Sequence, residues 1–173
     1  NRTSVTYAKK SLKLSLKSYL SFLNSPNTEN SKKMILASNL AGKAINISKT
    51  TAPHAISYPF TSLFGIDHGH AVSLTLEKFL LFNFKNINRS ETRFNLSGRY
   101  KIIFDVFQTK DINELYNKIK FLKKEANLID SFPNLGIKID SSMDKILSQI
   151  NFLRLKNNPI KVNKDDIIKI LND

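Results

Sequence analysis

Three observations predict that this sequence folds as an all-α protein, a helical bundle. In the opening segment apolar residues recur every three or four positions, which is the period of one face of a helix. The apolar stretch 71–84 is too long for a single strand, and no segment alternates apolar and polar residues as a half-buried strand does. The apolar residues of the opening segment are Val5, Ala8, Leu12, Leu16, Leu20 and Leu23.

The first two helices are expected before residue 50. The turn-forming segment 24–27 ends the first one, and Thr28 is a suitable N-cap for a second helix that runs to about Asn46. Gly42 is expected to let a neighbouring element approach the second helix closely. The small-residue face of this helix comprises Met34, Ala37, Ala41 and Ala44.

A short third helix is expected after residue 50. Thr50 and Thr51 can cap it, and Pro53 suits its first turn because that position needs no intrahelical N–H bond. Pro59 is expected to kink or end this helix, and Gly65 is a stop before the apolar helix 71–84. Gly69, just ahead of that helix, is expected to allow close approach of backbone.

Four further helices are expected in the second half of the chain. The last has the clearest start, because Asn163 can cap it and the acidic pair Asp165 and Asp166 suits the positive end of a helix dipole. We assign this acidic pair to the helix start and not to catalysis. The four expected ranges are 90–107, 111–126, 141–155 and 163–172.

Composition bounds the class of protein. At 173 residues with 41% apolar content the chain can bury a core, and it contains no run of the roughly 20 apolar residues that a membrane span needs. It has no cysteine, so thiolate metal sites and disulfides are excluded. The net charge of +13 comes from lysines scattered over amphipathic segments. We therefore expect a cytoplasmic protein that binds neither nucleic acid nor membranes.

All three histidines lie within one short window, at positions 54, 68 and 70. His54 falls in the first turn of the third helix and His68 just before the fourth, so we expect them to come from two elements that meet at a site. From the residues alone, each histidine is either a metal ligand or a capping or packed core residue. For His70 a hydrogen-bonded pocket wall and a substrate contact are equally supported. Before Asp67 the only acid is Glu29, so a metal site here is incomplete. Phosphate loops, nucleophile elbows and Cys–His pairs are absent.

At this window the sequence resembles the iron-containing (group III) alcohol dehydrogenases, a branch of the dehydroquinate synthase-like superfamily. The resemblance rests on the helical block 41–46, the block 51–58 around His54, and His68-Gly69 leading into an apolar helix. It is specific within 37–82 and most similar to the phosphonoacetaldehyde-reductase-like members. The segment Asn157-Asn158-Pro159 before a short acidic-start helix is also similar to the C-terminus of the family.

The resemblance implies that residues 1–173 are a single all-helical metal-site domain, with the dinucleotide-binding domain and the first metal-ligand helix outside this sequence. His54 and His68 match two of the family's metal ligands, and an aspartate and a further histidine would precede Asn1. The metal would be Fe²⁺ or Zn²⁺, and NAD(P) would bind mainly to the N-terminal domain. This chain alone is then expected to be inactive.

Where family members often carry a further histidine near the nicotinamide, this sequence has Tyr58. Tyr58 and His70 are therefore expected near substrate or cofactor, and no residue of the chain is assigned a catalytic role beyond metal binding. The implied reaction transfers hydride between the nicotinamide and a metal-bound alcohol or aldehyde. The expected substrate is a small alcohol or aldehyde, with a phosphonate as one option, and a homodimer is one expected state.

Two alternatives stay open at this point. A dehydroquinate-synthase-like metal-dependent lyase shares the His68-Gly69 pair, but the block Thr51-Ala52-Pro53-His54 favours the dehydrogenases. A non-enzymatic basic helical binding module would explain the charge, and it would bind duplex DNA in a salt-dependent manner.

Overall fold

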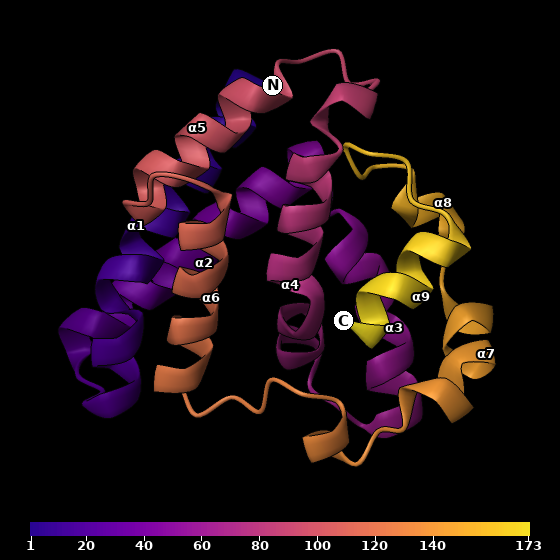
Figure 1. Cartoon of the computed structure of the whole chain (residues 1–173). Helices are drawn as coiled ribbons and strands as arrows, with labels where there is room; N and C mark the ends of the chain where they lie inside the picture. Colours follow the sequence, from indigo (N-terminus) through magenta and orange to yellow (C-terminus); the bar gives the residue numbers. More distant parts are fainter. The chain divides into compact units, whose positions relative to one another are not determined.

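A computed structural model describes residues 1–173, which form nine α-helices, two short 3-10 helices and no strand (Figure 1). The prediction of an all-α fold is confirmed. None of the helices has both the length and the apolar character that crossing a bilayer requires. The chain forms two compact units, which we describe separately: residues 1–49 with 98–126, and residues 50–97 with 127–173.

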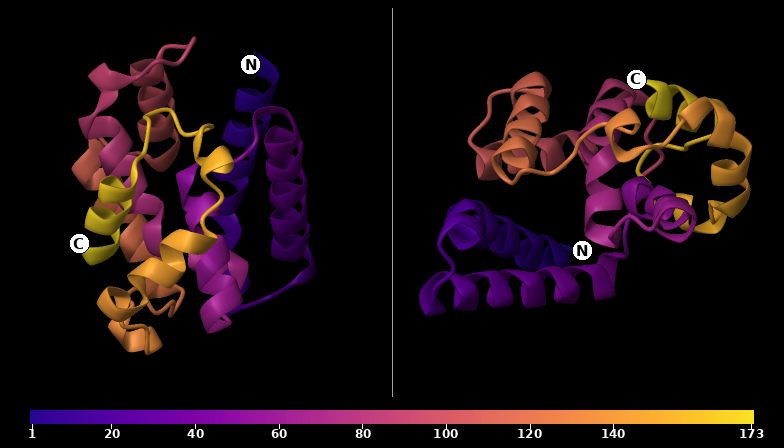
Figure 2. Two further views of the ribbon diagram at one scale, coloured as in Figure 1. Left: turned by 90° about the vertical axis from the view of Figure 1, so that its right-hand side faces the viewer. Right: turned by 90° about the horizontal axis from the view of Figure 1, so that it is seen from below.

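The first unit is built on a pair of helices, α1 (Arg2–Asn24) and α2 (Thr28–Ser48), which pack side by side in opposite directions (Figure 2). Small residues spaced by seven form the contact, and the Ser11 hydroxyl donates a hydrogen bond to the Ala37 carbonyl at 2.7 Å. The apolar stripe predicted for the first helix is only half-buried, since the buried face is this small-residue seam. The buried residues are Ser4, Ser11 and Ser18 of α1 and Asn30, Ala37 and Ala44 of α2.

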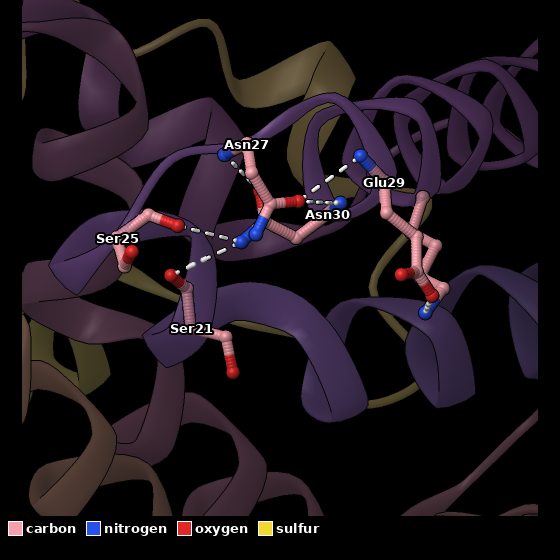
Figure 3. A network of polar contacts seen from close by, with 6 residues as sticks. Ser21, Ser25, Asn27, Glu29 and Asn30 are labelled. Atoms are coloured by element: carbon pink, nitrogen blue, oxygen red, sulfur yellow. Dashed lines mark hydrogen bonds and ion pairs between the residues drawn. The ribbon is translucent and has the colours of Figure 1, made fainter.

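A network of amide hydrogen bonds closes the turn between these two helices (Figure 3). The Asn27 side chain accepts from the N–H groups of Glu29 and Asn30, each at 3.0 Å, while the Asn30 side chain accepts from the Asn27 N–H at 2.9 Å. Asn30 also donates to the carbonyls of Ser21 and Ser25. The N-cap is therefore Asn27, not the predicted Thr28, because the amide satisfies two orphan N–H groups at once.

The first unit also contains α6 (Ile112–Glu125) and most of α5 (Leu96–Phe107). An ion pair of 3.0 Å between Lys9 and Asp105 joins α1 to α5. The helix predicted over 111–126 is confirmed, with Asp111 as its N-cap. At Gly42 a built Cβ would meet no atom within 4 Å, so the predicted close approach of a neighbour there is wrong.

The second unit buries a large apolar core between α3 (Ala52–Phe64), α4 (His68–Lys85) and the C-terminal helices α7 (Ile139–Gln149), α8 (Phe152–Leu155) and α9 (Lys164–Asn172). The rings of Phe60 and Phe132 stack at its centre with their centroids 5.0 Å apart. Phe79, Met143 and aliphatic side chains fill the rest of the core, with contributions from every one of these helices. Helix α4 covers the predicted apolar segment 71–84, which is confirmed as a helix.

Both ends of α3 lie where the sequence predicts them. Thr51 is the N-cap residue and Pro53 lies in the first turn as predicted, although the Thr51 side chain makes no capping hydrogen bond. Gly65 ends the helix in the left-handed conformation with φ of 67°, which a residue without Cβ adopts without strain. Pro59 does not end the helix, because the surrounding core holds the chain helical on both sides of it.

Two predicted helix boundaries are wrong for the same physical reason. The helix predicted over 90–107 begins only at Leu96, after a 3-10 turn over Ile87–Arg89, because the Ser90 and Thr92 hydroxyls bond each other and nearby backbone. The helix predicted over 141–155 is two helices, α7 and α8. The Asn151 side chain accepts from the N–H groups of Leu153 and Arg154 and so starts a new helix.

The last helix is confirmed close to its predicted range of 163–172. Asn163 caps α9, and its side chain and that of Asp166 exchange hydrogen bonds with each other's backbone N–H groups at 2.8 and 3.0 Å. Asp165 lies in the same first turn. A second short 3-10 helix, Pro133–Leu135, precedes α7 in this unit.

Candidate metal centre

The two predicted metal-binding histidines lie together in the second unit. His54 projects from the first turn of α3 and His68 is the first residue of α4, two helices in direct contact. The centroids of the two imidazole rings are 5.7 Å apart, so the prediction that these side chains meet is confirmed. After the turn at Gly65, the His68 ring lies against His54 and Tyr58 of α3.

Ser57 orients the His68 ring. Its hydroxyl donates to the His54 carbonyl at 2.8 Å and lies 3.2 Å from Nδ1 of His68. A hydroxyl carries one proton, so toward His68 the Ser57 oxygen acts as an acceptor and Nδ1 of His68 carries the hydrogen. The lone pair of Nε2 is then free to bind a metal, which is how outer-shell partners usually fix a histidine ligand.

His54, Ser57 and Tyr58 share one face of α3, because they are spaced by three and four residues. Ser57 is fully buried. It was not singled out from the sequence, although its position three residues after His54 is a signal that could have identified it. Burial, and secondarily the nearby His68, lower the pKa of His54. His54 therefore favours its neutral form, the form in which an imidazole binds a metal.

Tyr58 connects this pair to a cation from a distant part of the chain. Its ring lies against His68 with a centroid distance of 5.3 Å. The Arg154 guanidinium lies over the Tyr58 ring, 4.7 Å from the ring centroid, and donates a hydrogen bond to the Tyr58 hydroxyl. Arg154 was not singled out from the sequence, since no spacing or motif links it to Tyr58.

His70 lies one residue beyond Gly69, within the first turn of α4, and its Nε2 donates to the carbonyl of Ile129 at 2.7 Å. This bond anchors the segment before the 3-10 helix Pro133–Leu135 and leaves Nδ1 as the other polar atom of the ring. At Gly69 a built Cβ would meet no atom within 4 Å, so the close backbone approach predicted there is not found within this chain.

The donor set fits a divalent iron or zinc ion only in part. Imidazole nitrogens suit both metals, and two imidazole rings lie edge to face with their centroids 5.7 Å apart. No group of three or more His, Cys, Asp or Glu side chains is arranged to hold a metal in this structure. Because such ions take four or more ligands, the remaining ones would have to come from outside these residues.

The sequence model of the Fe-containing alcohol dehydrogenase family, C-terminal, matches residues 4–173. The chain therefore belongs to this family, which is the one that the sequence resembles most specifically within residues 37–82.

The names of two similar proteins each contain a two-carbon aldehyde with an acidic group. The phosphonoacetaldehyde reductase of Streptomyces viridochromogenes is 45% identical over 47 residues, which are 27% of this chain and 12% of that protein. The sulfoacetaldehyde reductase of Bifidobacterium kashiwanohense, solved in complex with NAD+, matches 98% of this chain and 43% of its own with a TM-score of 0.83 and 26% identity.

A third comparison supports the fold alone. An alcohol dehydrogenase from an archaeon of a Red Sea brine pool matches 99% of this chain and 44% of its own with a TM-score of 0.86 and 20% identity. The chain thus spans less than half the length of the solved relatives, and its match to the curated relative covers about an eighth of that protein.

Proposed function

We propose that the protein containing this chain is a metal-dependent alcohol dehydrogenase or aldehyde reductase linked to NAD(P). The observation that carries the proposal is the His54–His68 pair, with rings 5.7 Å apart, in a chain of the Fe-containing alcohol dehydrogenase family. Residues 1–173 would form the helical metal-site domain. A dinucleotide-binding domain and the other metal ligands would be supplied from outside it.

His54 and His68 would hold Fe²⁺ or Zn²⁺, with Ser57 keeping Nε2 of His68 directed to the ion. When bound, such an ion polarises an aldehyde carbonyl, and the nicotinamide supplies the hydride. Tyr58 lies against His68 and is 39% exposed, so its ring would form one wall of the substrate site. His70 is proposed to lie in the same vicinity, held by its bond to Ile129.

The proposed substrate is a small aldehyde with an acidic head group, such as a phosphonate. Both the phosphonoacetaldehyde and the sulfoacetaldehyde reductases named above support this class. We further propose a cytoplasmic location, because nicotinamide dinucleotides are maintained inside cells. A homodimer stays a prediction.

The test is reduction of aldehydes by the full-length protein with NADH or NADPH. We expect activity in the protein loaded with Fe²⁺ or Zn²⁺, loss of at least about 90% after removal of the metal by a chelator, and recovery on reloading. Absorbance at 340 nm follows the nicotinamide. Turnover that is unaffected by metal removal, or no turnover with any aldehyde, would contradict the proposal.

A further inference from the structure

The position of Arg154 is fixed by its neighbours although its own side chain is exposed. Asn151 caps the short helix α8, and Leu155, adjacent to Arg154, is buried in the apolar core. Helix α8 packs against α3, the helix that carries His54 and Tyr58. The guanidinium is held at Tyr58 by two contacts, the hydrogen bond to the hydroxyl and the stacking on the ring.

The charge of Arg154 is not neutralised by the protein. No carboxylate lies within ion-pair distance of its guanidinium. A guanidinium has five N–H donors, and one of them is engaged with the Tyr58 hydroxyl, so a fork of donors remains for a ligand. This fork matches two oxygens of a tetrahedral oxyanion better than an ammonium does.

One aromatic ring contacts both this cation and the metal-binding pair. The guanidinium carbon lies 4.7 Å and the centroid of the His68 ring lies 5.3 Å from the centroid of the Tyr58 ring. Because both groups lie next to the same ring, a short ligand beside it could place one end at the metal-binding pair and the other at the guanidinium. A two-carbon aldehyde with a phosphonate or sulfonate has that kind of length and the charge at one end only.

We propose that Arg154 binds the tetrahedral oxyanion of an acidic aldehyde, a phosphonate or a sulfonate, and so determines the substrate specificity of the site. Tyr58 acts as a positioning residue that holds the guanidinium beside the metal pair. This inference rests on the proposed aldehyde reductase function.

The test compares Arg154→Gln and Arg154→Lys with wild type in the full-length, metal-loaded protein. The substrates are phosphonoacetaldehyde, sulfoacetaldehyde and neutral propanal, each assayed for kcat/KM. In Arg154→Gln we expect the ratio of kcat/KM for the better acidic aldehyde to kcat/KM for propanal to fall about 100-fold, because a charge-assisted bidentate contact is lost. In Arg154→Lys this ratio should fall less, since lysine keeps the charge but lacks the forked donors of arginine.

Lys156→Gln is the matched control, because Lys156 is an exposed cation two residues further along and the change removes the same charge. It should leave the ratio within about threefold of wild type, since charges exposed to solvent interact weakly. Which acidic aldehyde has the higher kcat/KM identifies the head group. If kcat/KM in Arg154→Gln changes by the same factor for acidic and neutral aldehydes, so that the ratio equals that of wild type, the inference is overturned and the reductase function still stands.

A binding measurement separates the two proposals. Calorimetry with 2-hydroxyethylphosphonate and with 2-hydroxyethylsulfonate, the expected products, needs no turnover. We expect wild type to bind at least one of them about 100-fold more tightly than Arg154→Gln does. If wild type reduces no aldehyde but shows this Arg154-dependent binding, the reductase function fails and the anion site stands. If wild type binds neither product, Arg154 is not an anion site.

Discussion

At the scale of single residues, the orientation of His68 depends on Ser57. The Ser57 proton is committed to the His54 carbonyl, and this commitment makes its oxygen the acceptor for Nδ1 of His68. One buried hydroxyl thus links the backbone of one proposed ligand to the ring of the other. Without it, Nδ1 would lose its partner and the ring would rotate more freely.

We therefore expect Ser57→Ala to weaken metal binding by the full-length protein about 10- to 100-fold, the usual cost of losing an outer-shell partner. Competition with a chromophoric chelator measures the affinity. Ser62→Ala is the control, since Ser62 lies on the same helix and also contacts the carbonyl three residues earlier, but touches no imidazole. A metal affinity of Ser57→Ala equal to that of Ser62→Ala would show that Ser57 does not orient His68.

The sequence was sufficient to predict that His54 and His68 meet, because Pro53 and Gly65 mark the two ends of α3 and so place the histidines on two different helices. It did not identify Arg154. Arg154 and Tyr58 are 96 residues apart, and their contact arises from the packing of α8 on α3, which no local pattern encodes. Ser57 could have been found from its helical spacing to His54.

At the scale of secondary-structure elements, a buried pair of asparagines joins three parts of the second unit. Asn158 donates to Asn83 Oδ1 at 2.7 Å and to the Ile160 carbonyl at 2.8 Å, and Asn83 donates back at 3.3 Å. The N–H of Ala52, the first residue of α3, also bonds to Asn158 at 3.4 Å. The start of α3 is thus capped by a residue from beyond α8, in place of the Thr51 side chain.

Replacing Asn158 by Ala should reduce the free energy of unfolding by about 3 kcal/mol, because buried amide groups of Asn83 and Ala52 would lose their partners. Urea denaturation followed by circular dichroism checks this. Asn157→Ala removes a bond from an exposed amide to the Thr50 carbonyl and should cost less than about 1 kcal/mol. Equal urea midpoints for Asn158→Ala and Asn157→Ala would refute the structural role of the Asn83–Asn158 pair.

The presence of helices could be predicted from the spacing of apolar residues, and their ends could be predicted where a proline or a glycine lies at the end. The ends were mispredicted where polar side chains compete with the helix, at Ser90 and Thr92 and at Asn151. Packing faces were also hard to predict. In α1 the leucines suggested the buried face, whereas serines at seven-residue intervals form it, because small side chains let the backbones of α1 and α2 approach closely.

At the scale of the whole molecule, all the proposed chemistry of this chain lies in the second unit. That unit holds the apolar core, both proposed ligands, Tyr58 and Arg154. Two imidazoles bind a divalent ion weakly unless further ligands join them. Under the proposed function, those ligands and a dinucleotide-binding domain would come from outside residues 1–173.

The central claim is that His54 and His68 hold the metal, and the metal content of purified full-length variants tests it most directly. Elemental analysis after loading with Fe²⁺ or Zn²⁺ should find less than about a tenth of an ion per chain in His54→Ala and in His68→Ala, with turnover lost in parallel. Tyr58→Phe and the histidine control His70→Ala should retain about one ion per chain, as in wild type. One full equivalent of metal and near-normal turnover in His54→Ala and His68→Ala would contradict the account.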